Sequence, residues 1–153
     1  MTTKEIEHIA YKHFSKIGWY GCFEVAVPRA IIDKYHRERV DFLTYETNGI
    51  WRCYEIKRNL QDWKSGSKLS WYAHYNYLIC PPDLYNKIKD EIPNDIGVWL
   101  VYKTGNNKGF LDCVKKPKKK TLLCSHEDMM QSLVQALSRE YKKYRKILEK
   151  KDK

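Results

Sequence analysis

Two β-rich runs joined by a short turn constrain the fold of this sequence more than any other feature. Residues 39–46 and 50–57 are rich in β-branched and aromatic side chains. The Thr-Asn-Gly segment between them, residues 47–49, is typical of a β-hairpin turn. A three-residue loop, closed by a glycine in the left-handed conformation, would pair Glu46 with Ile50. Both strands would then have one defined register.

That register decides whether three charged residues meet. A two-residue turn would set Asp41 opposite Ile56, whereas the three-residue loop sets Asp41 opposite Glu55, with Cα atoms about 4.5 to 5.5 Å apart. Strand alternation puts Lys57 on the same face as Glu55. Two carboxylates at this distance repel unless a cation neutralises them. Mg²⁺ (or Mn²⁺) prefers such oxygen ligands, so the hairpin predicts a metal site.

The chemistry that this arrangement predicts is metal-dependent hydrolysis of a phosphodiester. Asp41 and Glu55 would bind the metal ion, which polarises a phosphate and acidifies a bound water. Lys57 would hold that water or stabilise the charge that develops on the phosphate. The alternative is a cross-strand ion pair of the same residues on an exposed sheet face, which contributes little stability.

The rest of the chain predicts helices and strands around this hairpin. Thr2 and Glu5 form a capping box that opens an amphipathic helix, which Gly18 ends. The last helix opens at Ser125, carries an apolar stripe that includes Met129, Met130, Leu133, Val134, Leu137 and Tyr141, and ends in a basic segment that we expect to fray. Further segments are predicted as strands at 22–28, 75–80, 96–102 and 110–114, a short helix and loop over 60–74, and a helix over 83–92.

This order of elements predicts an α/β (α+β) fold in which helices flank a central mixed sheet. A chain of 153 residues is long enough for one compact domain with a sizeable core. We place the catalytic core at residues 1–114. The basic loop and last helix, residues 115–153, are expected to pack on the same domain.

The charge of the chain indicates a polyanionic partner. There are 29 Lys and Arg against 19 Asp and Glu, a net charge of +10, and each phosphate that a cation neutralises releases counterions. No apolar run approaches the roughly 18 residues of a membrane-spanning helix, and the N-terminal segment lacks the layout of a secretory signal. We therefore expect a cytoplasmic protein of prokaryotic or phage origin that binds DNA. The five cysteines show no metal-ligand spacing and are expected to be mostly buried thiols.

A family resemblance rests on the same charged residues. Residues 39–41 (Arg-Val-Asp) and 55–57 (Glu-Ile-Lys), followed by Asp62, Lys64 and Lys68, resemble the PD-(D/E)XK nuclease superfamily. Within it, the chain is similar to the MmcB-like DNA-repair proteins over about residues 4–102. The resemblance implies a restriction-endonuclease-like core of order αβββαβ, with Asp41 and Glu55 as metal ligands and Lys57 as the catalytic lysine. Val40 stands where the name of the superfamily has a proline.

Other acidic residues are open to two interpretations. By the resemblance, Glu24 would correspond to an upstream acidic residue that some branches of the superfamily use, which makes it a candidate further metal ligand. Strand alternation places it opposite Phe23 and Val25, which suits a metal site and plain solvent exposure equally. Glu5 and Glu7 lie in the first helix, where acidic residues favour the helix dipole, and we attribute them to that role.

Cations and aromatic residues follow the lysine, as in grooves that bind nucleic acid. Arg58, Lys64 and Lys68 are candidates to contact a phosphate backbone, whereas at least half of the aromatic residues between 71 and 77 are expected in the core. The basic run 115–120 and the C-terminal segment offer a second cationic surface, or serve solubility alone. No base-reading motif accompanies them, so no sequence specificity is predicted.

Together these features predict a Mg²⁺-dependent deoxyribonuclease, an endonuclease or other hydrolase that acts in DNA repair, recombination, restriction or phage DNA processing. The alternative is a non-catalytic DNA-binding accessory protein with the same fold. Since the chain is small, a homodimer or a protein partner is also expected, with the apolar stripe of the last helix as one contact.

Overall fold

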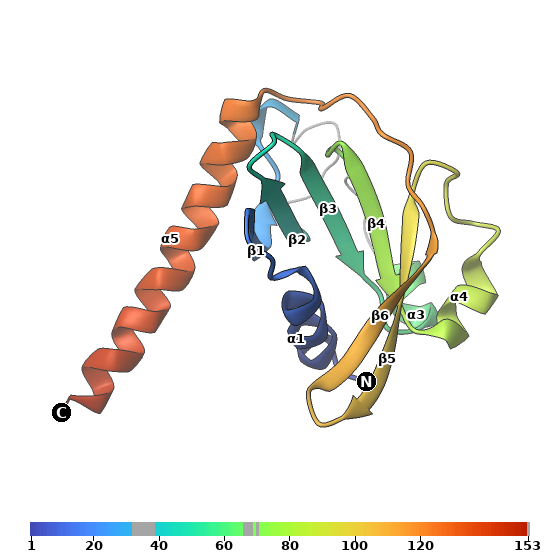
Figure 1. Ribbon diagram of the computed structural model, residues 1–153, viewed down its shortest axis with the longest axis horizontal. Helices are drawn as coiled ribbons and strands as arrows, with labels where there is room; N and C mark the ends of the chain where they lie inside the picture. The colour runs from blue at the N-terminus through green and yellow to red at the C-terminus, as the bar shows by residue number, and fades with distance from the viewer. Residues whose placement is uncertain (32–38, 66–68, 70, 153) are drawn as a thin grey trace.

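The computed structural model describes residues 1–31, 39–65, 69 and 71–152, which form an α+β fold with helices around a six-stranded mixed sheet (Figure 1). The helices are α1 (Thr3–Phe14), α3 (Leu60–Ser65), α4 (Pro82–Ile88) and α5 (His126–Lys151). The strands are β1 (Trp19–Ala26), β2 (Arg39–Glu46), β3 (Trp51–Ile56), β4 (Tyr75–Cys80), β5 (Gly97–Gly105) and β6 (Lys108–Lys115). The predicted fold class is confirmed.

The strands lie in the sheet in their order along the chain. β1, β2 and β3 form an antiparallel meander, β3, β4 and β5 run parallel, and β6 returns antiparallel to β5. α1 covers one face, where the Phe14 ring packs against Phe42, Tyr54 and Trp99. α4 and the first turns of α5 complete core clusters with residues that alternate to the other face, such as Leu43 and Leu78.

Two local sequence signals are confirmed. In the hairpin loop Gly49 has a φ of +90°, and the Glu46 N–H donates to the Ile50 carbonyl at 2.9 Å, as the three-residue loop requires. At the start of α1 the Thr2 hydroxyl accepts from the Glu5 N–H at 3.1 Å, while the Glu5 carboxylate accepts from the Thr2 N–H at 2.9 Å. Both contacts join residues that are close in sequence.

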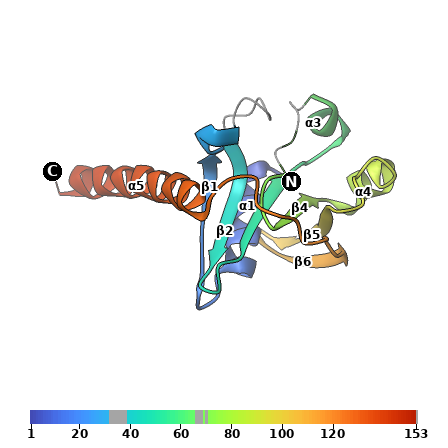
Figure 2. The same cartoon turned by 90° about the horizontal axis from the view of Figure 1, so that it is seen from above.

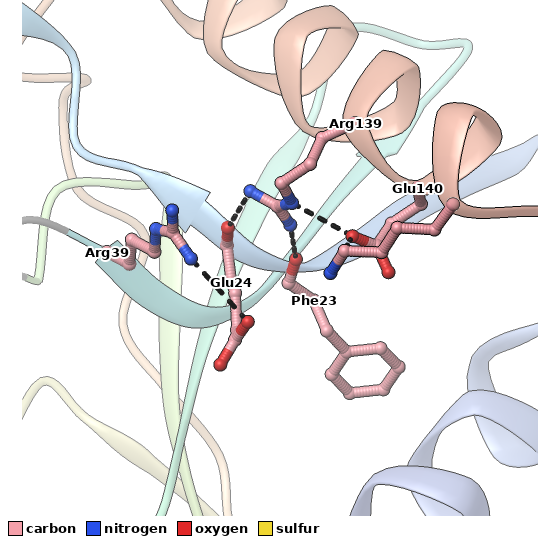
Figure 3. A network of polar contacts seen from close by, with 6 residues as sticks. Phe23, Glu24, Arg39, Arg139 and Glu140 are labelled. Atoms are coloured by element: carbon pink, nitrogen blue, oxygen red, sulfur yellow. Dashed lines mark hydrogen bonds and ion pairs between the residues drawn. The ribbon is translucent and has the colours of Figure 1, made fainter. Parts of the chain in front are cut away.

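The predicted side-chain alternation of β1 is wrong. Glu24 has a φ of +53°, a left-handed conformation that rotates the chain and breaks the period of two. Phe23 therefore stacks on Phe42, with 4.3 Å between ring centroids, on the α1 side of the sheet. Val25 is instead buried in the cluster shared with α5. Arg139 of α5 holds this bend, because its guanidinium donates to the carbonyls of Phe23 and Glu24 (Figure 3).

The predicted fraying of the last helix is also wrong, because α5 continues to Lys151. Its apolar stripe does not act as one face, since Met129 and Leu133 are buried whereas Val134 and Tyr141 are exposed. The physical reason is that α5 packs with its first turns only and then extends away from the sheet (Figures 1 and 2). Within the described part of the chain, no helix is both long and apolar enough to cross a membrane.

Candidate active site at the fork between β2 and β3

β2 and β3 pair at the hairpin end and separate at the other. Their ladder ends at Phe42 and Tyr54, and beyond that point, among the described residues, β2 pairs with β1 and β3 with β4. The two strands therefore form a fork. The ladder has the register that the three-residue loop predicts, with Phe42 opposite Tyr54. Asp41 and Glu55 are the next residues along β2 and β3, where the fork begins.

The Asp41 carboxylate bridges this fork. Its Oδ2 atom accepts a hydrogen bond of 2.7 Å from the Ile56 N–H. In the paired part of the ladder, backbone carbonyls of β2 take this role. The contact holds one carboxylate directly beside the Glu-Ile-Lys segment of β3.

Glu55 is fully buried, with 0% of its surface exposed. Its charge acts on two neighbouring residues, Cys53 and Tyr72. Burial, and then the charge of Glu55, raise the pKa of the Cys53 thiol. Burial, the neighbouring Cys53 and the Glu55 charge likewise raise the pKa of the Tyr72 hydroxyl. Because an ionised carboxylate is costly to remove from water, this position disagrees with an ion pair on an exposed sheet face.

Lys57 is also buried, with 6% of its surface exposed. Its backbone N–H donates to the Ile79 carbonyl at 3.0 Å, and its ammonium donates to the Asp62 carbonyl at 3.3 Å. The Asp62 side chain in turn accepts from the Arg58 N–H at 3.0 Å, and the Asp62 N–H donates to the Asn59 side chain at 2.8 Å. The turn that opens α3 thus holds the lysine at the end of β3.

The helix α1 brings a carboxylate to the fork that sequence analysis attributed to the helix dipole. Burial raises the pKa of Glu7, and the negative charges of Glu24 and Asp41 raise it further, against the opposing effect of Lys4. Glu7 therefore shares the electrostatic environment of Asp41. One signal in the sequence could have revealed it: Glu7 precedes the buried residue Ala10 by three positions, which puts it on the margin of the packed helix face.

Glu24, the candidate further metal ligand, lies at the surface. Its side chain is 57% exposed and forms an ion pair with Arg39 at 3.7 Å. Figure 3 shows this contact beside the Arg139 guanidinium, which also contacts Glu140 at 2.8 Å. Glu24 is thus paired across β1 and β2 and is far more accessible than Glu55.

The residues proposed to contact DNA differ in their surroundings. Arg58 and Lys64 are exposed near the fork, and Arg58 lies 3.9 Å from Asp62. Lys68 lies outside the described residues. Of the basic run 115–120, Lys115 donates to a backbone carbonyl at 2.8 Å and burial lowers its pKa, while Lys120 pairs with Asp95 at 3.1 Å. Part of this run is therefore bound to the protein itself.

Aromatic residues downstream of the lysine belong largely to the core, as predicted. Tyr72 is fully buried and Tyr77 nearly so, while Trp63 and Trp71 pack against the cluster under α4.

The cysteine thiols are poor nucleophiles. Burial raises the pKa of all five cysteines, to about 12 for Cys80, which keeps them protonated at neutral pH.

The donor set at the fork suits a small hard cation. Among the described residues, no group of three or more His, Cys, Asp or Glu side chains is arranged to hold a metal ion. Mg²⁺ needs fewer protein ligands, because it binds through one or two carboxylates and completes its shell with water and substrate phosphate oxygens. Asp41 and Glu55 fit that requirement in kind.

Comparison with known proteins bears on the fold. No protein-family model and no curated protein matches this sequence. Among solved structures, the chain is similar to the SPO1766 protein of unknown function from Silicibacter pomeroyi. The TM-score is 0.70 at 14% sequence identity, over 95% of this chain and 92% of that one. At this identity, the likeness shows that the two chains share a fold.

Proposed function

We propose that this protein is a Mg²⁺- or Mn²⁺-dependent deoxyribonuclease of the PD-(D/E)XK type. The observation that carries the proposal is the fork itself, where the Asp41 carboxylate accepts from the Ile56 N–H, between Glu55 and Lys57 in the chain. Glu55 and Lys57 are both buried, a rare position for charged side chains. Charged residues in such a position are typical of functional sites.

Each residue has a defined part in the proposed reaction. Asp41, oriented by the Ile56 N–H, and Glu55 would hold the cation. When bound, the cation would polarise the scissile phosphate and acidify a water. An ammonium has three donors, so the bond from Lys57 to Asp62 leaves others to orient the attacking water or to stabilise the phosphate charge.

Electrostatics support a metal ion as a condition for cleavage. The whole chain carries +10, which attracts DNA over a distance, and the exposed cations Arg58 and Lys64 lie near the fork. Asp41 and Glu55 at the fork, and Glu7 near Asp41, are acidic and would repel a phosphate. A bound divalent cation would reverse that local repulsion.

The test is cleavage of linear, nicked, branched and circular single-stranded DNA in Mg²⁺, Mn²⁺ or EDTA. We expect cleavage that requires the metal, and a loss of roughly a hundredfold or more in Glu55→Gln and in Lys57→Gln. Asp112→Asn is the matched control, because Asp112 is exposed on β6, and it should cleave as the parent does. Circular dichroism checks that each variant is folded.

Two outcomes would contradict the proposal. Cleavage that survives EDTA, or that Glu55→Gln retains, would remove the fork from the reaction. Intact DNA under every condition, together with binding that weakens as salt rises, would support the DNA-binding accessory protein instead.

A further inference from the structure

The helix α5 is far longer than its contact with the sheet. It spans 26 residues, about 39 Å at 1.5 Å per residue. Its buried residues are confined to the first turns, namely Met129, Ser132, Leu133 and Ala136. Arg139 adds two hydrogen bonds to β1, and beyond that point the helix extends away from the body as an arm (Figures 1 and 2).

The arm carries an apolar seam that is distinct from the packed face. Spacings of three and four residues alternate along the seam residues, which are Val134, Leu137, Tyr141, Tyr144 and Leu148. This is the heptad spacing of a and d positions in a coiled coil. The first four of these side chains are 41–59% exposed. Because Leu137 follows the buried Ala136 by one residue, the seam lies about 100° around the helix from the packed face.

The charged residues beside the seam indicate which helix the arm would pair with. With Val134 at an a position, Glu140 takes a g position and Arg145 the next e position. In a parallel, in-register pair of helices, each g residue lies beside the next e residue of the other helix, so Glu140 would meet the partner's Arg145 twice by symmetry. An antiparallel pair would place g beside g, where Glu140 meets either a second Glu140 or the apolar residue Ile147. The arm is therefore complementary in charge to a second copy of itself in the parallel orientation.

We propose that residues 134–148 of α5 form a parallel two-stranded coiled coil with the same segment of a second copy of this chain. A seam of this length is short for an isolated coiled coil. Here the helix is already ordered and anchored to β1 by Arg139, which lowers the entropy cost of association. The basic residues Lys142, Lys143, Lys146 and Lys150 occupy outer positions of the heptad and remain on the surface of the dimer.

The first test is sedimentation velocity of the full chain across the micromolar range, in roughly 0.3 M salt so that the outer lysines are screened. We expect a monomer–dimer equilibrium, and at least a tenfold weaker one in Tyr141→Glu, because the charge would face the apolar seam. Lys142→Glu is the matched control. It makes a larger change of charge at the neighbouring outer position and should leave dimerisation within a few-fold of the parent.

A charge exchange tests the orientation. Glu140→Arg and Arg145→Glu should each weaken the dimer, since each alone puts like charges face to face, and an equimolar mixture of the two should dimerise as the parent does. Within one chain Glu140 also contacts Arg139 and Lys143, so circular dichroism checks that helix content is unchanged. A chain that stays monomeric at every concentration overturns the proposal. A dimer that is indifferent to Tyr141→Glu, or whose strength the mixture does not restore, overturns it as well.

Discussion

The two ends of the β2–β3 pair differ in how their charged side chains are arranged. At the hairpin end the Arg52 guanidinium forms an ion pair with Glu46. It also lies 4.7 Å from the ring centroid of Trp19 and 5.1 Å from that of Tyr75. The side chains of Arg52 and Glu46 are only 18% and 12% exposed. The charges there cancel inside a shell of aromatic rings.

At the fork end, several acidic side chains come from different elements. Asp41 and Glu55 come from the two strands, and α1 adds Glu7, whose pKa is raised by burial and by neighbouring carboxylates. Among the described residues, Lys57, which directly follows β3, is the one buried Lys or Arg. The same two strands thus contain an ion pair at one end and acidic side chains from both strands at the other, as expected where a site binds a cation.

The largest effect should come from Arg52→Ala at the hairpin end. Removal of one partner leaves Glu46 charged and poorly hydrated, and we expect a loss of about 3 to 5 kcal/mol in the free energy of unfolding. Urea denaturation measures it. Arg58→Ala is the control, because its ion pair is exposed, and it should change stability by less than about 0.5 kcal/mol. An equally small loss for Arg52→Ala would mean that the two ends do not differ in this respect.

The next effect should come from the hairpin loop. Gly49 has a φ of +90°, and a Cβ atom added at this position would meet no other group within 4 Å, so Gly49→Ala reports backbone strain alone. We expect a loss of about 1 to 2 kcal/mol. Gly49→Asn should lose less, because asparagine tolerates left-handed conformations. Equal losses in the two variants would argue against strain as the cause.

Acidification should change the stability that the two ends contribute in opposite directions, beginning with a loss at the hairpin end. The His74 Nδ1 atom accepts from the Trp51 N–H at 3.0 Å, and burial, with Lys119 and Arg52 nearby, lowers the His74 pKa below 6.5. The unfolded chain therefore takes up this proton first. The stability that His74 contributes is present above about pH 6.5 and is lost as pH falls toward the folded pKa. Urea midpoints between pH 7 and pH 5 should fall less in His74→Gln than in the parent.

The smallest effect concerns Glu7 at the fork. Its raised pKa has the opposite consequence: the folded state binds this proton more tightly, so stability is lost as pH rises above the ordinary value of 4.5. Asp41→Asn removes one charge while an amide oxygen can still accept from the Ile56 N–H, so it should lower the pKa of Glu7. Carboxyl chemical shifts measured against pH by NMR report this directly. If neither Asp41→Asn nor Glu24→Gln changes the pKa of Glu7, Glu7 lies apart from the fork.

The strand register beside the candidate site could be predicted because it depends on one turn. The length of the loop at residues 47–49 fixes which residue pairs with which on β2 and β3, up to Phe42 and Tyr54 next to the fork. The depth of burial could not be predicted in the same way. It depends on Tyr72 and on the helices that cover the sheet, and these contacts join residues distant in the sequence. The nuclease activity itself stays a prediction.

The sequence by itself determined the features that arise between near neighbours: the capping box at Thr2, the hairpin register, and the helical and strand segments. Only the tertiary structure decided which polar residues meet. It brought Glu7 to the fork and rotated β1 at Glu24, and it left most of α5 outside the core. The physical reason is that local patterns follow from backbone geometry over a few residues. Burial and electrostatic neighbours follow from how separate elements pack.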